Sequence, residues 1–409
     1  MASEPDAATV DRSWDVVVVG AGPAGAAAAL SAARVVGPSR VLLLDRHTFP
    51  RDKVCGDGIA AEALTELAGL GVDLDELTAG YPPITRLRLT GPAGGIADRD
   101  LPDAVRVIPR EVFDARLVDA VRGRGIEVRQ VHVRGLRASD GGWTLDLRSP
   151  RIHHAASDRG RQIRARVVIG ADGAHSVVRR HLLGDHPVRT ALAIRGYPAA
   201  RPGQDLTQLI TMTGEHWPAY AWSFPLGDGR ANIGYGELLG ESPVTKADLM
   251  ARLDRLLPGA AADPTVLWRA HPLPLSPARP TVSDGTVLLV GDALSLVNPL
   301  SGEGIYYAVR SGALAGAAST AADPGRVYRR ILRRDLGPHL RATAAVTALL
   351  RGPRLLDVGV RAAARRQRVF DDLVRMALAD GGITPRLLRG LASSVLDDRA
   401  SRSAAGHTP

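Results

Sequence analysis

Three glycines near the N-terminus, Gly20, Gly22 and Gly25, have the Gly-x-Gly-x-x-Gly spacing of diphosphate-binding turns. The first glycine permits a tight turn, the second lets the backbone approach the diphosphate, and the third lets the following helix pack on the preceding strand. The start of that helix offers free N–H groups and the positive end of its dipole. Asp45 follows 20 residues after Gly25, where an acidic side chain can accept hydrogen bonds from ribose hydroxyls. The sequence therefore predicts a dinucleotide site, and this motif alone leaves NAD and FAD both open.

Two later motifs favour FAD. An Asp-Gly pair begins at Asp172 and a Gly-Asp pair ends at Asp292, each after a short apolar run typical of a buried strand. Segment 298–304 (NPLSGEG) then leads into a helical pattern, and N–H groups at a helix start would stabilise the negative charge of a reduced flavin ring. Two structural roles stay open, Asp292 as a helix N-cap and Asp172 as a turn residue. Besides the glycine turn and Asp45, the candidate cofactor contacts are Ala24, Arg46, Asp172, Gly291, Asp292, Pro299, Gly302 and Gly304.

The elements that would position these residues alternate between strands and helices, as in an α/β fold. Apolar or alternating runs predict strands at 15–19, 41–44, 84–90, 127–133, 143–147, 167–169 and 287–290. Apolar positions spaced by three and four predict helices at 23–34, 60–70 and 110–122. Residues 186–280 are rich in strands and turns, and the chain is mostly helical from about residue 308. We expect residues 1–13 to form a disordered tail and residues 149–161 a loop.

Length and composition set broad limits. A chain of 409 residues is too long for one small core, so two closely joined domains are expected. The formal charge of +9 comes almost entirely from arginine, which fits a GC-rich genome, although such a surface could also attract anionic lipid or substrate. We expect no nucleic-acid partner.

The single cysteine, Cys55, excludes an internal disulfide. No run of 18 apolar residues and no secretory signal is present, so we expect a cytoplasmic protein without a transmembrane helix.

Three segments carry a family resemblance. Segment 49–58 (FPRDKVCGDG) resembles a loop around a Cys-Gly pair beside the flavin, and segment 220–225 (YAWSFP) resembles a Tyr-x-Trp-x-Phe-Pro substrate motif. Together with segment 291–305, they resemble flavoproteins of the p-hydroxybenzoate hydroxylase type, and within these the geranylgeranyl reductases, including menaquinone-side-chain reductases. The likeness covers about residues 14–315. Segment 59–63 (IAAEA) departs from the Leu-Thr-Pro-Arg-Ala of many relatives, which leaves the substrate open.

The resemblance implies a glutathione-reductase-like, Rossmann-type FAD domain with an inserted antiparallel-sheet substrate domain and a helical C-terminal region. The sheet domain would roof a tunnel for an apolar substrate. The resemblance also places Cys55 and Gly56 beside the flavin and implies that Arg110 contacts the cofactor, unless it is a solvated first-turn arginine. The expected domains are an FAD-binding domain (14–80, 105–185 and 281–330), a substrate-binding sheet domain (81–104 and 186–280) and a C-terminal helical region (331–409).

The implied activity is reduction of a carbon–carbon double bond in an apolar, prenyl-lipid or polyketide-like substrate. Such chemistry needs the alkene held beside the flavin with water excluded. Tyr220, Trp222 and Phe224 alternate along a strand and so share one face, which could bind the substrate or could be plain core packing. Cys55 could shape the pocket, tune the flavin or simply fill space. The candidate catalytic residues are Cys55, Tyr220 and Trp222.

A second activity is compatible with the same motifs. A monooxygenase acting on an aromatic or polyketide substrate would share the fold and both Asp-containing motifs, whereas flavin halogenases carry Trp-x-Trp-x-Ile-Pro in place of the motif at Tyr220. The sequence has no second dinucleotide motif, so NAD(P)H would bind transiently or a ferredoxin would act as electron-donor protein. The basic, amphipathic segment 341–395 could contact a membrane peripherally or could form an ordinary helical cap.

Overall fold

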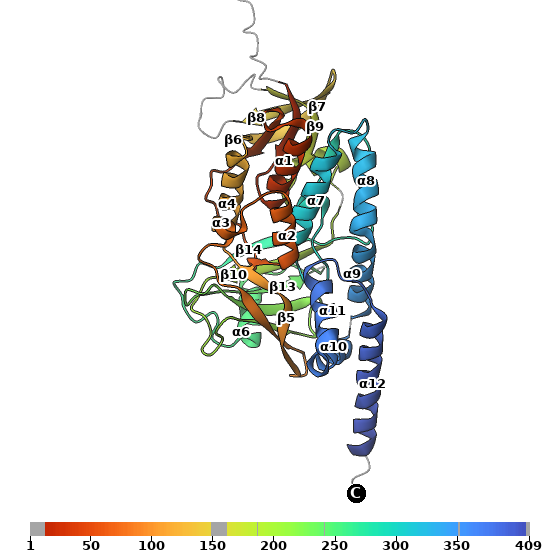
Figure 1. The fold of residues 1–409 in the computed structure, drawn as a ribbon. Helices are drawn as coiled ribbons and strands as arrows, with labels where there is room; N and C mark the ends of the chain where they lie inside the picture. The colour runs from red at the N-terminus through yellow and green to blue at the C-terminus, as the bar shows by residue number, and fades with distance from the viewer. Residues whose placement is uncertain (1–12, 149–161, 186, 241, 351, 406–409) are drawn as a thin grey trace, which may run out of the picture.

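The computed structural model describes residues 13–148, 162–185, 187–240, 242–350 and 352–405 (Figure 1). Almost all of the expected N-terminal tail and the whole expected loop at 149–161 lie outside the described residues. Two β-sheets, a group of helices on the first sheet and four C-terminal helices make up the fold. This is the predicted α/β class with a Rossmann-like sheet, a second sheet and a helical C-terminal region.

The first sheet is built around two apolar parallel strands, β1 (Trp14–Val19) and β9 (Gln162–Gly170). On one side of β1 lie β2 (Val41–Asp45) and then β6 (Glu127–Gln130), both parallel to it. The second half of β9 pairs in parallel with β15 (Val287–Leu289). Its first half pairs with the antiparallel β8 (Gly142–Arg148), which continues to β7 (His132–Ser139). Strands β1, β2 and β15 and the second half of β9 are apolar because helices and loops cover both of their faces, whereas β6 at the edge is polar.

Helices α1 (Pro23–Val36) and α7 (Ile305–Ala318) pack side by side on this sheet (Figure 1). Small residues allow the close contact: a Cβ added to Gly312 would lie 2.2 Å from the Ala24 carbonyl oxygen. The contact brings the N-terminal ends of the two helices together at the same edge of the sheet. The other elements around the first sheet are η1 (Pro38–Arg40), α2 (Ala61–Gly69), α3 (Leu74–Thr78), α4 (Arg110–Gly123), α5 (Val177–Leu183), η2 (Gly291–Leu294) and α8 (Pro324–Asp335).

The second sheet has the order β14-β10-β13-β12-β11-β4-β5-β3 and is antiparallel except between β11 and β4. One face of β12 and β13 packs against α6 (Lys246–Leu256), through Leu249 and Leu253. The opposite face turns toward the first sheet. The strands are β3 (Gly58–Ile59), β4 (Ile84–Thr90), β5 (Ile96–Val107), β10 (Thr190–Gly196), β11 (Thr207–Met212), β12 (Ala219–Pro225), β13 (Ala231–Leu238) and β14 (Arg269–Pro274).

Four helices close the chain: α9 (Gly337–Leu349), α10 (Pro353–Arg365), α11 (Gln367–Leu378) and α12 (Pro385–Ala405). Helices α10 and α11 pack on β5, where Phe370 and Val374 join the apolar residues of β4 and β5. Helix α12 extends away from the body of the molecule (Figure 1). Among the described residues, no helix has the length and apolarity needed to cross a bilayer.

The structure corrects some expected elements. The single strand expected at 127–133 is two strands, because β6 pairs with β2 whereas the chain from His132 onward pairs with β8. Helix α6 lies in a region interpreted from the sequence as rich in strands and turns, although Leu249, Met250, Leu253 and Leu256 have helical spacing. Strand β5 runs to Val107, so the expected domain boundary at 104/105 falls inside a strand. The domain limits therefore stay a prediction.

Candidate functional site

A cavity of about 730 Å³ lies between the two sheets and the C-terminal helices. It reaches from the glycine turn before α1, past the Cys55 loop and the inner face of β12, to apolar side chains of α9 to α12. All the site residues predicted from the sequence line this cavity except Gly25 and Gly291, which lie directly behind its wall. Residues more than two hundred positions apart in the chain therefore meet around one space.

The glycine turn has the geometry that a diphosphate requires. Gly20 has a φ of 103°, and a Cβ there would lie 2.3 Å from the Ala171 carbonyl oxygen. A Cβ on Gly25 would lie 1.7 Å from the Gly20 carbonyl oxygen, so only glycine allows α1 to start here. Gly22 differs, because a Cβ there would meet only the tips of Arg51 and Arg110, at 3.5 and 3.6 Å, and the carboxylate of Asp114. Its backbone faces the cavity, as the second glycine of the motif should.

Asp45, at the end of β2, is held by two backbone groups. Its Oδ2 accepts from the Ala21 N–H and its Oδ1 from the His47 N–H, both at 2.8 Å. Each carboxylate oxygen keeps a further lone pair for a ribose hydroxyl. The neighbouring Arg46 is exposed at the cavity rim.

Arg110 is buried at the start of α4, with 4% of its surface exposed, which excludes the alternative of a solvated first-turn arginine. Its expected contact with the cofactor stays a prediction. Its guanidinium donates two hydrogen bonds of 2.7 Å to the Asp114 carboxylate, one turn along the helix. Arg51 reaches the same carboxylate at 2.9 Å. Burial alone would lower the pKa of Arg110, but Asp114 outweighs this effect and the pKa is raised. Two cations and one anion leave a net positive charge beside Gly22, where a diphosphate would lie.

The loop before α7 lines another part of the same cavity. Asn298, fully buried, donates to the Tyr307 hydroxyl and to the Met376 carbonyl, both at 3.0 Å, and so fixes the loop between α7 and α11. Gly302 takes a φ of 73°, and Gly304 is the N-cap residue of α7. The loop thereby presents backbone next to a helix start, an arrangement that suits an electron-rich ring.

The two motif aspartates have separate surroundings. Asp292 accepts a hydrogen bond of 2.9 Å from Lys53, and although burial would raise the pKa of Asp292, Lys53 lowers it overall. Because Gly304 caps α7, the interpretation of Asp292 as the cap of that helix is wrong. Asp172 accepts from the Val177 N–H at 2.7 Å and from Ser176, so its carboxylate is engaged by the first turn of α5. Burial raises the pKa of Asp172.

Asn232 of β13 joins the Cys55 loop to the second sheet. Its side-chain N–H groups donate to the Cys55 carbonyl and to Asp57, each at 2.8 Å, while its oxygen accepts from the Trp222 indole at 2.8 Å. Asp57 is fully buried with a φ of 60°, also accepts from the Tyr197 hydroxyl, and has a pKa raised by burial to about 6. Burial likewise raises the pKa of the Cys55 thiol, which therefore stays protonated at neutral pH.

Tyr220, Trp222 and Phe224 lie on the inner face of β12, as the alternation predicted, and all three line the cavity. Neighbouring ring centroids are 5.9 and 6.4 Å apart. Gly234 makes room for the indole, since a Cβ there would lie 2.3 Å from a Trp222 ring carbon. The Tyr220 hydroxyl donates to the Ser301 carbonyl and joins this strand to the loop before α7.

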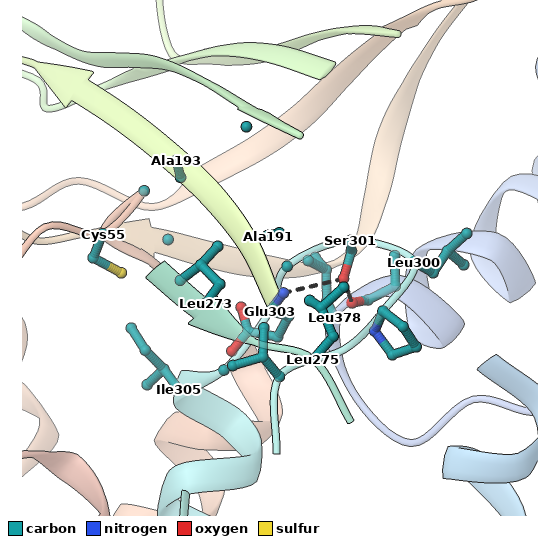
Figure 2. Close-up of a pocket in the computed structure, with 18 of the residues that line it drawn as sticks. Cys55, Ala191, Ala193, Leu273, Leu275, Leu300, Ser301, Glu303, Ile305 and Leu378 are labelled. Atoms are coloured by element: carbon teal, nitrogen blue, oxygen red, sulfur yellow. Dashed lines mark hydrogen bonds between the residues drawn. The ribbon is translucent and has the colours of Figure 1, made fainter. Parts of the chain in front are cut away.

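Several residues that line the cavity or support its wall were missed by sequence reasoning, although signals for some were present. Asp57 and Glu303 lie within two of the recognised segments, and Asn232 begins the Asn-Ile-Gly that follows the aromatic motif. Arg51 also lies within the recognised segment 49–58, but its contact with Asp114 depends on a residue distant in the chain. Tyr197 gave no local signal. Figure 2 shows how Cys55, Glu303, Leu273 and Leu378, from four separate elements, surround the same space.

These features fit a bound FAD. The close-packed glycines, the Arg51–Arg110 pair and the α1 start suit its diphosphate, Asp45 suits its ribose, and the loop before α7 suits the flavin ring. Beyond the Cys55 loop, the cavity is lined mainly by aliphatic side chains of the C-terminal helices. This apolar remainder leaves room for an apolar substrate.

Comparisons with known proteins agree with this geometry. The model of an FAD-binding-domain family matches residues 13–317. The menaquinone reductase of Mycobacterium tuberculosis is 34% identical over 376 residues, covering 85% of this chain and 86% of that protein. Digeranylgeranylglycerophospholipid reductase 2 of Methanopyrus kandleri is 32% identical over 323 residues, covering 76% and 77%.

A solved structure supports the same fold. The geranylgeranyl bacteriochlorophyll reductase-like protein of Thermoplasma acidophilum superposes with a TM-score of 0.76 at 19% identity, covering 94% of this chain and 97% of that one. The glycine turn, the Cys55 loop and the aromatic strand thus occur within a fold shared with named reductases. The chain belongs to the FAD-binding-domain family, among its geranylgeranyl and menaquinone-side-chain reductases, and is an FAD-dependent oxidoreductase.

Proposed function

We propose that the protein reduces carbon–carbon double bonds in the isoprenoid chain of a prenyl lipid, such as a menaquinone or a geranylgeranyl lipid. The observation that carries this proposal is that the dinucleotide-binding residues and a long apolar wall of α9 to α12 line one continuous cavity. An extended isoprenoid chain matches such a wall, because burying it there removes apolar surface from water. The names of the relatives support the same substrate class.

The residues of the chain would divide the work. Bound FAD, once reduced, supplies the hydride. Arg51, Arg110 and the α1 start hold the diphosphate, and the loop before α7 holds the ring. Tyr220, Trp222 and Phe224 orient the alkene against it, while the protonated Cys55 thiol shapes the pocket. The packed walls exclude water, which protects the reduced cofactor and strengthens polar contacts within the site.

The test is anaerobic incubation of dithionite-reduced protein with polyprenyl lipids, followed by mass spectrometry. A product heavier by two hydrogens supports the proposal. A product heavier by one oxygen, formed only in air, would instead make the protein a monooxygenase. Stopped-flow reduction with NADPH, NADH or reduced ferredoxin would identify the donor, which we propose to bind transiently because the chain has one dinucleotide motif.

Trp222→Ala is expected to lower kcat/KM for the lipid by about 30-fold, or ~2 kcal/mol, the value of one well-placed aromatic contact together with its area. FAD affinity should change less than threefold. Tyr235→Ala is the matched control, because Tyr235 is a fully buried aromatic on the neighbouring strand that faces α6 rather than the cavity. Equal losses of turnover in both variants would mean that Trp222 is ordinary core.

We further propose that the protein acts from the cytoplasm at a membrane surface, through the mouth of the cavity. Of the eight exposed large apolar side chains among the described residues, four line the cavity, and all four lie on or beside the C-terminal helices: Leu349, Leu355, Ile383 and Leu388. Exposed Arg354 and Arg389 are sequence neighbours of Leu355 and Leu388, and cations favour an anionic bilayer. A lipid chain could then enter the cavity without crossing water.

The double variant Leu355→Ser/Leu388→Ser should bind anionic phosphatidylglycerol vesicles about 10-fold more weakly, since partial burial of two leucines contributes ~1.4 kcal/mol or more. Co-sedimentation measures this change. Ile96→Ser/Leu267→Ser removes two exposed apolar residues that do not line the cavity and should leave binding unchanged. If both double variants bind as the unmodified protein does, the C-terminal mouth is not the contact.

A further inference from the structure

Glu303 is a carboxylic acid within the cavity, in the loop that precedes α7. Its Oε1 accepts a hydrogen bond of 2.8 Å from the Tyr306 N–H, in the first turn of α7, and this contact fixes the side chain against the helix start. The guanidinium of Arg110 is already bound to Asp114 and affects Glu303 less than burial and the helix N–H groups do. The acid therefore has a defined position without a dedicated countercharge.

Apolar side chains surround this carboxyl group. Leu273 of β14, Leu275 directly after that strand and Ile305 of α7 lie around it, and Cys55 faces it across the same space (Figure 2). Burial raises the pKa of Glu303 to about 7, although the N–H groups of Tyr306 and Ile305 act in the opposite direction. The group can thus carry a proton at neutral pH and still release it.

Reduction of an alkene requires a proton as well as a hydride, and three other acidic groups of the cavity, Cys55, Tyr220 and Asp57, suit this task less well. Burial raises the pKa of both the Cys55 thiol and the Tyr220 hydroxyl above their ordinary values, which makes each a weak donor. Asp57 is engaged through one oxygen by Tyr197 and Asn232 and belongs to the scaffold of the Cys55 loop. A general acid works best with a pKa near the working pH, which Glu303 has.

We infer that Glu303 is the proton donor of the reduction, an inference that rests on the proposed function. In this step, the hydride and its two electrons add to one alkene carbon from the reduced flavin, and the other carbon forms its C–H bond with the Glu303 proton. The Glu303 O–H bond breaks, and its electron pair stays on the carboxylate. Water at the cavity mouth returns the proton after the product leaves. The products are thus oxidised flavin and a saturated carbon–carbon bond, and the acid is regenerated, so atoms and electrons balance.

Glu303→Gln is the direct test, because glutamine has the same size and its oxygen can still accept from the Tyr306 N–H. FAD affinity should stay within threefold of the wild-type value, and the melting temperature within a few degrees. The single-turnover rate of lipid reduction should fall by about 100-fold or more. The wild-type rate should decline as the pH rises through about 7, when the acid loses its proton, and the variant should lack this decline. Glu62→Gln is the control, since Glu62 influences Glu303 electrostatically but does not line the cavity.

A second readout does not depend on turnover. In D₂O, infrared difference spectra of the FAD-loaded protein between about pH 5 and 9 should contain a protonated-carboxyl band that titrates near 7 and is missing in Glu303→Gln. If the wild type reduces the lipid and Glu303→Gln does so within threefold of its rate, the inference is wrong and the proposed function stands. If the wild type yields only an oxygenated product, the proposed function and the inference both fail.

Discussion

Gly25→Ala should yield a folded protein that binds FAD at least about 100-fold more weakly and purifies without its yellow colour. The added methyl group would lie 1.7 Å from the Gly20 carbonyl oxygen, a distance that no side-chain rotation can relieve. Either the turn or the start of α1 must move, and overpacking of this kind costs ~3 kcal/mol, which is two decades of affinity. Titration of the apoprotein with FAD, followed by flavin fluorescence, measures the change.

The control for this variant is Gly69→Ala, at the end of α2. A Cβ there would meet nothing within 4 Å, and the backbone needs no positive φ. This change should leave FAD affinity as it is. Unchanged affinity in Gly25→Ala would mean that the diphosphate does not lie on this turn, and the assignment of the cofactor site would have to be abandoned.

Asp114→Ala should destabilise the protein by ~3–5 kcal/mol, because it removes the carboxylate that neutralises the buried Arg110 guanidinium. Arg51 would lose the same partner. Urea unfolding of the apoprotein, monitored by circular dichroism, measures this loss apart from any effect on FAD. Bound FAD should recover part of the stability, since its diphosphate would replace the missing negative charge beside the two arginines.

Asp119→Ala, on the same helix, is the matched control. Asp119 pairs with Arg122 at the surface with 70% of its side chain exposed, so its loss should cost under ~0.5 kcal/mol. The double variant Arg110→Met/Asp114→Leu removes both buried charges and should be more stable than Asp114→Ala. Similar unfolding curves for Asp114→Ala and Asp119→Ala would show that the buried pair contributes little.

The elements of the dinucleotide site could be predicted because their signals are local. The strand, glycine turn and helix from Trp14 to Val36 form one continuous segment, and the acidic residue that ends β2 follows at fixed spacing. The aromatic alternation in 220–224 likewise indicates the shared face directly, since side chains alternate across a strand. Helix α6 was missed although its apolar spacing and its Thr245–Asp248 capping box were present, because the strands and turns on either side dominated the interpretation of that region.

The roles that the sequence left undecided depended on burial and on distant partners. Arg110 is equally compatible with a surface or a buried position until Asp114 and the packing of α4 are seen. The Lys53 partner of Asp292 lies 239 positions away in the chain, so no spacing rule could suggest it. The same holds for Asn232, which joins residues of the Cys55 loop to the indole of Trp222.

The sequence by itself determined the α/β class, the preference for a flavin over a nicotinamide and the resemblance to prenyl reductases, and it predicted the glycine turn as the diphosphate site. Each of these follows from residue types at short, fixed spacing, which local geometry constrains directly. Only the tertiary structure decided that α9 to α12 line the same cavity as the candidate cofactor residues, and that Glu303 faces Cys55 across this cavity. Burial and the pKa of a buried acid arise from contacts among elements far apart in the chain, and those contacts exist only once the two sheets and the terminal helices have packed together.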